Sequence, residues 1–330
     1  MEFANETGLP AVFARGSTTD REMVGVVAAK LTARVQDGRL TRCEGEDAWP
    51  VFEEAYAFGG VTLSPETDFR KRATDIIVFG QAVAPRGEPC AAMRVGVRCG
   101  AVGLDLDVVG DRWWQRAGGG LVPSDPLPFV TMPLTSDRAY GGVGSFQGMP
   151  VPHGGNPAGR GFAMTEEEAE GRPLPNLERP GEGLRAWTDR PAPAFFYRPS
   201  APALTPEQVE KPPLEIAAGL MEEAGQDAVA ELIARPGELG TELRLYGFDP
   251  WEEVVLPLPP FHGPDVVVQV GPHRSRFPTS IGTVVALVDE RVLVVTYRCV
   301  FRYLFRPGEA RTARLGWRSR SAGRPAAEAA

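Results

Sequence analysis

The sequence predicts a mainly β protein with an antiparallel, two-sheet, sandwich-like architecture, long loops rich in Gly and Pro, and a short helical insert. Three observations carry this prediction. Apolar and polar residues alternate with period two from Met93 to Val108. Apolar runs bounded by turn residues return from Thr241 to Phe305, and between these blocks only residues 205–235 carry a helical pattern. Strands early and late, with few helical residues between them, favour packed antiparallel sheets.

Composition places the chain among ordinary globular proteins. It has 330 residues, 43% of them hydrophobic and 24% charged, with a net charge of -8. This charge gives no general reason to bind nucleic acid or anionic lipid. The first residues are acidic where a signal peptide would be basic, and no apolar run is long enough to span a membrane. We therefore expect a cytoplasmic protein with neither nucleic-acid nor membrane partners.

The first third of the chain predicts two strands. Met23 to Val35 is rich in Val and Ala and runs into Asp37-Gly38, a turn signal, so it predicts a strand that enters a hairpin. Asp75 to Gly80 is a short apolar run, typical of a strand buried on both faces. Glu44 to Phe69 has no period and predicts a loop region. Its expected packing anchors are aromatic: Trp49, Phe52, Tyr56 and Phe58.

The clearest pattern is a hairpin around Gly100-Ala101. Met93 to Cys99 and Val102 to Val108 each alternate apolar and polar residues, so each strand has one face toward a core. Arginines on the first strand are placed to pair with aspartates on the second. This hairpin leads directly into the segment from Gly110 to Phe162.

The segment Gly110 to Phe162 contains 12 Gly and 7 Pro in 53 residues, together with six aromatic residues. Gly and Pro alone would suggest disorder, but disordered segments are poor in aromatics. The pattern therefore predicts a long ordered loop pinned by aromatic anchors, a kind of loop that is usually functional. Trp113 and Trp114 are adjacent, so one is expected to be buried and the other available to a partner.

The second half predicts a helix start, a helical insert and late strands. Thr165 with Glu168 forms a capping box. The helical insert near 205–235 begins at the N-cap Thr205 and carries an apolar stripe. Phe195, Phe196 and Tyr197 are expected to be buried in a proline-rich connector, and Asp289-Glu290 marks a second tight hairpin. We predict one β-rich domain over residues 1–306 and a flexible tail rich in Arg and Ala over residues 307–330.

No catalytic or metal-binding constellation is evident, so no cofactor, no metal and no catalytic residue is predicted. The three histidines lack metal-ligand spacing, and there is no G-x-S-x-G elbow. The four cysteines form no C-x-x-C pair and predict reduced, mostly buried thiols. Two alternatives stay open: a hydrolase that uses Asp111 and Glu178 as acids, and a sugar- or peptide-binding module with Trp114 and Tyr140 as an aromatic platform.

Short motifs along the chain resemble those of a bacterial family of formally unknown domain function, encoded beside the VgrG and PAAR spike genes of type VI secretion systems. The resemblance starts at Asp75 to Gly87 and returns around Thr296 to Cys299. Between them it rests on Gly110-Asp111-Arg112 with Trp114, Pro126 to Leu134, Ala139 to Gly142, Asn156 to Phe162, and Leu174 to Glu178. The chain departs from the family pattern at Ser136-Asp137, where members usually have Tyr-Glu.

The resemblance implies a non-enzymatic adaptor or chaperone that binds a toxin effector and helps to load it onto the VgrG/PAAR spike. It implies that the motif residues either bind the partner or hold the segment that does, while the helical insert is the other candidate for choosing the effector. The candidate residues are Asp111, Arg112, Trp114, Phe129, Arg138, Tyr140, Gly141, Gly142, Asn156, Arg160 and Phe162.

Overall fold

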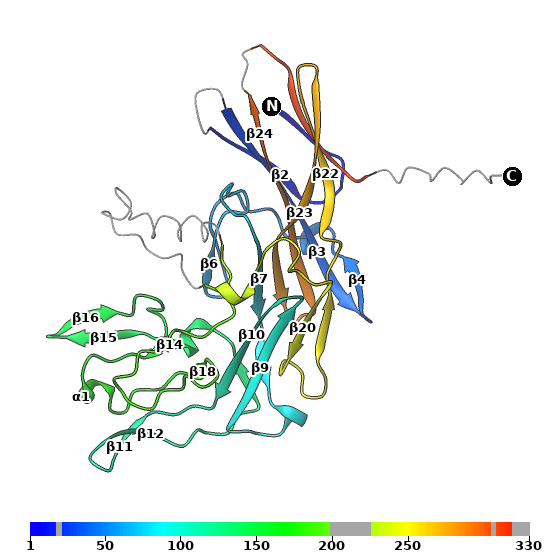
Figure 1. Cartoon of the computed structure of the whole chain (residues 1–330). Coiled ribbons are helices and arrows are strands. Elements are labelled where there is room, and N and C mark those ends of the chain that lie inside the picture. Colours follow the sequence, from blue (N-terminus) through cyan, green and yellow to red (C-terminus); the bar gives the residue numbers. More distant parts are fainter. Residues whose placement is uncertain (18–21, 199–225, 305–307, 319–330) are drawn as a thin grey trace.

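The structure, a computed structural model, describes residues 1–17, 22–198, 226–304 and 308–318 (Figure 1). Strands account for 51% of it and helices for 6%. The prediction of a mainly β protein is therefore confirmed. No helix in these described ranges combines the length and apolar character that crossing a membrane requires.

The largest sheet has ten strands, and its main path runs β1-β25-β22-β23-β24-β3-β2. These are β1 (Glu2–Asn5), β25 (Arg311–Gly316), β22 (His262–Val270), β23 (His273–Leu287), β24 (Val292–Leu304), β3 (Glu22–Gln36) and β2 (Ala11–Ser17). Three further strands join it at one end: β4 (Arg39–Arg42), β7 (Thr74–Phe79) and β19 (Ile233–Ala234). β7 runs parallel to β23, and its first five residues are buried, as the apolar run predicted.

The second sheet has five strands in the order β18-β10-β9-β20-β21. They are β18 (Leu177–Glu178), β10 (Val102–Val109), β9 (Ala92–Cys99), β20 (Glu242–Tyr246) and β21 (Val254–Pro257). The predicted hairpin of β9 and β10 is confirmed with its charge pairing: Arg94 to Asp107 is 2.8 Å and Arg98 to Asp105 is 2.6 Å.

The two sheets do not form a clean sandwich, so this part of the prediction is wrong. One half of the large sheet packs its apolar side chains, such as Ile77 and Val285, against Val97 and Leu106 of the second sheet. The other half curls into a nearly closed form around a separate core (Figure 1). β3 and β23 have 15 residues each and β9 only eight. The long strands therefore extend beyond the second sheet. Because they are twisted, the extended part of the large sheet can curl and bury its apolar side chains against one another.

The segment from Gly110 to Phe162 is ordered, but it consists of short paired strands and is not one long loop. It contains β11 (Trp114–Ala117), β12 (Gly120–Pro123), β13 (Thr131–Pro133), β14 (Tyr140–Gly141), β15 (Val143–Phe146), β16 (Met149–Pro152), β17 (Arg160–Gly161) and the 3-10 turn η3 (Ser136–Arg138). Two hairpins turn tightly where φ is positive, at Gly118-Gly119 and Gln147-Gly148. Glycine-rich sequence thus marks hairpin turns here.

We call residues 110–190 the motif module, because this stretch has a small core of its own. That core contains Trp114, Tyr140, Phe162, Leu174 and Leu184. The capping box produces only a four-residue helix, α1 (Glu166–Ala169), in which Thr165 Oγ1 accepts a hydrogen bond from the Glu168 amide at 3.2 Å. In Figure 1 the module projects to one side of the two sheets.

Two other expectations concern the helical insert and the tail. Most of the insert lies outside the described residues. Its last part forms the 3-10 turn η4 (Ala230–Leu232) and strand β19, so a helix through Arg235 is wrong there. The flexible tail from residue 307 is wrong for Arg311–Gly316, because β25 pairs with both β1 and β22 and buries Ala313 and Leu315. The alternation of these residues was too short to predict a strand.

The remaining elements complete the loop regions. Glu44 to Phe69 contains η1 (Gly45–Asp47), β5 (Tyr56–Phe58) and β6 (Val61–Leu63), while β8 (Gln81–Val83) pairs with β13 and η2 (Pro85–Gly87) follows it. The predicted anchors Trp49, Tyr56 and Phe58 pack against the main core. Phe195, Phe196 and Tyr197 are buried as expected.

Two buried lysines tie these loops to the large sheet. Lys30 on β3, buried under the ring of Phe52, pairs with Glu66 at 2.7 Å. Burial lowers the pKa of Lys30, and Glu66 opposes this shift. Lys71 pairs with buried Asp75 and donates to Thr283 Oγ1 at 2.8 Å. Only three of the 35 basic residues are lysines. This rarity was the one feature of the sequence that distinguished Lys30 and Lys71 from the other basic residues.

Cysteine reactivity provides a test of this packing. All four thiols are free; Cys99 and Cys299 are buried, while Cys43 and Cys90 are half-buried. Burial raises the pKa of Cys299 to about 12. We expect an alkylating reagent at mildly alkaline pH to modify Cys43 and Cys90 first, and the other two only after denaturation, because the thiolate is the reactive form. Peptide mass spectrometry would measure this; rapid native labelling of Cys99 or Cys299 would contradict the packing.

Candidate functional site

The candidate residues from the sequence converge where the motif module joins the second sheet. Asp111 and Arg112 follow β10, Arg138 ends η3, and Tyr140 begins β14. The segment 174–178 leads into β18. β18 pairs with β10, and the Ala139 backbone bridges to Leu177. Motifs that lie up to 68 residues apart in the sequence, from Gly110 to Glu178, thus meet at one junction.

Asn176 is the hub of this junction. Its side chain is buried and donates to Val109 O at 2.9 Å and to Asp111 Oδ1 at 3.0 Å. Its Oδ1 accepts hydrogen bonds from Arg138 at 3.0 Å and from Arg160 at 3.2 Å. A single amide therefore connects the end of β10 to both arginines. Sequence reasoning did not select Asn176, although it lies in the quoted Leu174 to Glu178 motif.

Asp111 lies beside the two arginines, and its side chain is 57% exposed. Its carboxylate is 3.4 Å from Arg138 and 3.9 Å from Arg160. Arg160 also contacts Asp137, donating to its backbone O at 2.8 Å. Burial, followed by repulsion from Arg138, lowers the pKa of Arg160. The group is a charge network that joins loops at their base.

Arg112 makes a separate, deeper ion pair. Its guanidinium contacts the Glu178 carboxylate, and the two side chains are only 11% and 9% exposed. Glu178 Oε1 also accepts a hydrogen bond from the Leu184 amide at 3.3 Å. This pair holds the start of the motif module against β18 and the chain that follows it.

Asn156 closes the turn that contains Gly141 and Gly142. Its buried side chain donates to Ser136 O at 2.7 Å and to Tyr140 O at 3.1 Å. Gly141 has a φ of 147°, and a Cβ there would lie 2.0 Å from Asn156 O. Only glycine fits at this position, which explains the first of the paired glycines of the motif.

The aromatic candidates are core residues. Trp114 and Tyr140 are each 1% exposed, and the Tyr140 hydroxyl donates to Asp189 O at 3.1 Å. Phe162 is buried beneath the Arg190 guanidinium, 5.3 Å from its ring centre, and Phe129 is half-buried. Trp114 and Tyr140 therefore offer no open platform for a sugar. Trp113 is 41% exposed, so the prediction that one of the two tryptophans is buried and the other accessible is confirmed.

The carboxylates considered for hydrolysis are engaged with different partners. Asp111 contacts Arg138 and Asn176, whereas Glu178 contacts Arg112. Each carboxylate is thus held as an ion-pair partner within the junction. In the described part of the chain, no group of three His, Cys, Asp or Glu side chains is placed to hold a metal ion.

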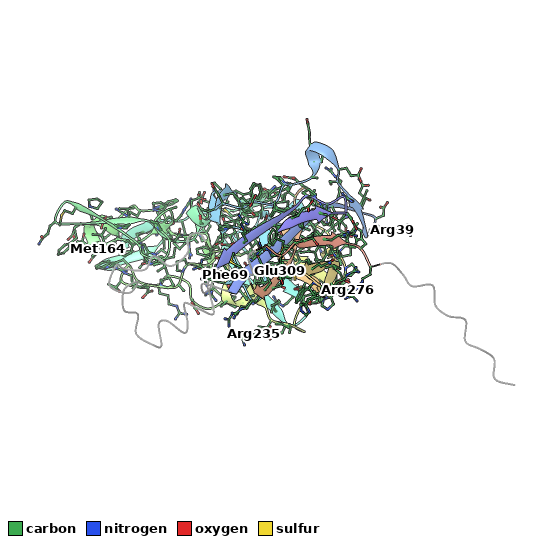
Figure 2. All side chains as sticks on the ribbon, turned by 90° about the horizontal axis from the view of Figure 1, so that it is seen from above. Arg39, Phe69, Met164, Arg235, Arg276 and Glu309 are labelled. Atoms are coloured by element: carbon green, nitrogen blue, oxygen red, sulfur yellow. The ribbon has the colours of Figure 1, made fainter. Side chains whose placement is uncertain are left out.

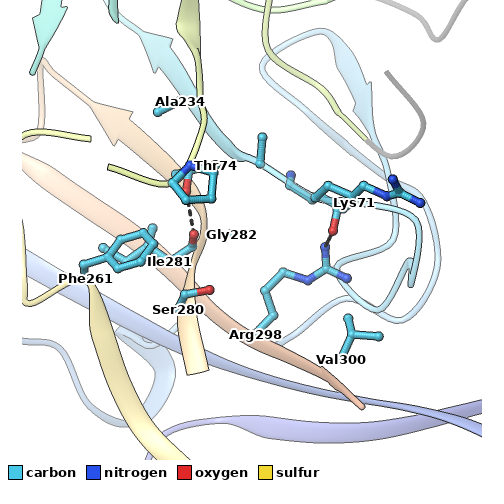
Figure 3. A pocket seen from close by; sticks show the side chains of 12 residues that line it. Lys71, Thr74, Ala234, Phe261, Ser280, Ile281, Gly282, Arg298 and Val300 are labelled. Atoms are coloured by element: carbon cyan, nitrogen blue, oxygen red, sulfur yellow. Dashed lines mark hydrogen bonds between the residues drawn. The ribbon is translucent and has the colours of Figure 1, made fainter. Parts of the chain in front are cut away.

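A small cavity of about 120 Å³, lined by both polar and apolar side chains, lies between β7, β23 and β24 (Figure 3). Arg298 lies against Gly282, where a Cβ would be 2.2 Å from its Cδ, and it donates to Lys71 O at 3.3 Å. Thr74 donates to Ile281 O at 2.6 Å. Burial lowers the pKa of Arg298. Arg298 thus fastens the loop before β7 to the sheet, a role that sequence reasoning missed.

Most of the large hydrophobic residues that are exposed lie in the motif module. Of the eleven exposed large hydrophobic residues among those described, seven lie within the 53 residues from 110 to 162. We call these seven the hairpin surface: Trp113, Val122, Leu127, Val130, Val143, Phe146 and Met149. Figure 2 shows the module, marked by Met164, at one end of the molecule, with Arg39 and Arg276 at the other.

Comparison with known proteins identifies the family. A family model described as "Uncharacterized protein conserved in bacteria (DUF2169)" matches residues 19–298, which is most of the chain. No curated protein and no solved structure matches the chain. The matched range includes the whole junction and the hairpin surface. The chain therefore belongs to the DUF2169 family of uncharacterised bacterial proteins.

Proposed function

We propose that this protein is a non-enzymatic adaptor or chaperone that binds a type VI secretion toxin effector in the cytoplasm and assists its loading onto the VgrG/PAAR spike. The secretion role rests on the resemblance of the motifs from Asp75 to Glu178. The partner-binding role rests on the hairpin surface. Among the residues that the structure describes, seven of the eleven exposed large hydrophobic ones are concentrated in this one module, and exposed apolar surface on a folded protein commonly marks a site of protein association.

The observation that carries the binding role is the contrast between the buried and the exposed side chains of the motif module. Trp114, Tyr140 and Asn156 are buried and fix the turns, whereas Phe146 and Met149 at the tip of the β15–β16 hairpin are 50% and 62% exposed. Rigid support lowers the entropic cost of presenting apolar side chains to a partner. The motif residues thus act as the scaffold, and the hairpins contact the toxin.

A triple variant tests this assignment. The variant combines Trp113→Ala, Phe146→Ser and Met149→Ser. We expect that it no longer co-purifies with the toxin from the native host. The wild-type protein is expected to co-purify with both the toxin and a spike component. The three side chains are exposed, so each change is expected to alter the free energy of unfolding by only about 0.5 kcal/mol. Mass spectrometry of the captured proteins and a denaturation curve would measure both effects.

Phe69→Ser is the matched control, because Phe69 is 54% exposed and lies outside the motif module. It should leave the captured proteins unchanged. Equal capture by the triple variant would exclude the hairpin surface as the toxin-binding site. A wild-type complex that contains neither a toxin nor a spike component would refute the secretion role itself.

A further inference from the structure

The cavity between β7, β23 and β24 has a positively charged wall (Figure 3). Lys71, Arg72 and Arg298 line it, and none of the other described residues around it carries a charge. Lys71 is ion-paired with Asp75, so its charge is already balanced. The two arginines therefore supply the charge that a ligand in this cavity would meet.

Arg298 is a buried cation without a carboxylate partner among the described residues. It is 6% exposed, and its guanidinium donates to the backbone oxygens of Asp68 and of Lys71, the latter at 3.3 Å. A guanidinium has five N–H donors, so these two bonds leave others unused. A carbonyl has only a partial charge, and a buried ion needs a counter-ion to offset its loss of water. The Arg298 guanidinium therefore favours an additional negative charge.

The carboxylates near Arg298 do not balance its charge. Burial lowers the pKa of Arg298 by more than these carboxylates raise it. Each of them is held by another cation: Asp68 by Arg70, Asp75 by Lys71 and Glu66 by Lys30. An anion in the cavity would supply the missing charge.

The large sheet is shaped to admit the Arg298 side chain. The pairing of β23 with β24 shifts its register between Ile281 and Thr283, so Gly282 is an extra residue in the ladder. The Arg298 side chain crosses Gly282, where a Cβ would lie 2.2 Å from its Cδ. Bulges of this kind redirect side chains and are frequent beside functional sites. The bulge and the glycine together bring the Arg298 side chain to the cavity (Figure 3).

Arg72 and Val300 lie on the exposed side of the cavity. Arg72 is exposed and forms no ion pair with any residue that the structure describes, while Val300 is 42% exposed. Ser280 is half-buried and adds a hydroxyl to the wall. The Thr74 hydroxyl already donates to Ile281 O at 2.6 Å. Arg72, Arg298 and Ser280 are therefore the side chains of this wall that can donate to a ligand.

A larger hollow of about 850 Å³ adjoins the cavity and shares Arg72 with it. The two carboxylates among its described lining residues have partners of their own. Glu231 is paired with Arg179, and Glu238 accepts a hydrogen bond from the Arg235 amide at 2.8 Å. Neither carboxylate forms an ion pair with Arg72, so the positive charge at the entrance of the cavity is not balanced by this hollow.

We propose that the cavity binds a small dianionic oxyanion of the phosphate class between the guanidinium groups of Arg298 and Arg72. The planar N–H fork of arginine matches the oxygen atoms of such an ion, and charge-assisted hydrogen bonds are roughly twice as strong as neutral ones. Two arginines without carboxylate partners balance two negative charges, which favours a dianion over a monoanion. Ser280 donates a further hydrogen bond, and the volume of about 120 Å³ suits a single ion. This site does not depend on the proposed secretion role.

The test uses the full-length protein in a phosphate-free buffer and inorganic phosphate as the probe. Isothermal titration calorimetry at mildly alkaline pH, with ionic strength held constant by sodium chloride, is expected to show saturable binding of one phosphate per chain. Acetate, a monoanion, should bind about tenfold more weakly or less. The melting temperature should rise with phosphate and not with chloride, because a ligand that binds only the folded state stabilises it.

Arg72→Ala should weaken phosphate binding about tenfold or more, the usual effect of losing a hydrogen bond between two charged groups. Arg72 is exposed, so this variant is expected to fold normally. Ser280→Ala should weaken binding by a smaller factor. Arg39→Ala is the matched control, because Arg39 is an exposed arginine on β4 and its loss changes the net charge equally. It should leave phosphate binding unchanged.

The proposal is overturned if calorimetry detects no phosphate binding to the wild type, or if Arg72→Ala binds phosphate as tightly as the wild type. Equal weakening by Arg72→Ala and Arg39→Ala would reduce the effect to net charge and would also overturn it. Equal binding of acetate and phosphate would exclude a dianion site. The hairpin triple variant should bind phosphate normally, so failure of the toxin experiment leaves this test independent.

Discussion

Lys30→Met is expected to lower the free energy of unfolding by about 3–5 kcal/mol, the usual effect of breaking a buried ion pair from one side. The Glu66 carboxylate has a side-chain exposure of 6% and would lose its partner, which lies 2.7 Å away in the wild type. The rings of Phe52 and Tyr56, 4.4 and 5.6 Å from the ammonium, would lose their cation. Urea denaturation followed by circular dichroism would measure the change.

The partner substitution separates charge from packing. Lys30→Met with Glu66→Gln should recover most of the loss, because glutamine is neutral: its side-chain oxygen can accept from the Phe52 amide, while its NH2 group donates to the Thr296 hydroxyl. Arg244→Ala, which removes an exposed pair with Glu242, should have a much smaller effect. A Lys30→Met protein as stable as the wild type would show that this ion pair does not hold the loop.

Arg112→Ala is expected to destabilise the protein by a similar amount, about 3–5 kcal/mol, and to loosen the motif module first. Its loss leaves buried Glu178 without its ion-pair partner at the point where β18 of the module pairs with β10. Hydrogen exchange should therefore rise over residues 110–178 before it rises in β23 and β24, because local opening precedes global unfolding. Mass spectrometry of exchanged peptides would locate the effect.

Arg116→Ala is the matched control for this experiment. Arg116 lies on β11 of the same module, but its side chain is 50% exposed and its partners Glu166 and Glu170 are on the surface. We expect its exchange pattern to match the wild type. Uniform loosening of the whole molecule by Arg112→Ala would show that the module does not open separately.

Local patterns predicted the strands that have one solvent face or two apolar faces. The β9–β10 hairpin and β7 followed directly from their period and composition, since side-chain direction alternates along a strand. The curl of the large sheet did not follow. It depends on how far β3 and β23 extend beyond their neighbours, which is a relation between distant segments.

The candidate site was predicted in part. The motifs identified the residues of the junction, but their composition did not distinguish a binding surface from its support. Burial decided this: Trp114 is inside the module, and its neighbour Trp113 is on the surface. Asn176 was missed because an asparagine acquires its importance from four groups that only folding brings to it.

By itself, the sequence determined the secondary-structure class, the positions of the main hairpins and the stretch where glycine, proline and aromatic residues concentrate. These properties depend on backbone preferences and on alternation over a few residues. The tertiary structure alone decided which motif residues are buried, which charges pair, and which apolar side chains of the motif module are exposed. Those properties depend on contacts between residues far apart in the chain, and no local pattern encodes which distant groups will exclude water from one another.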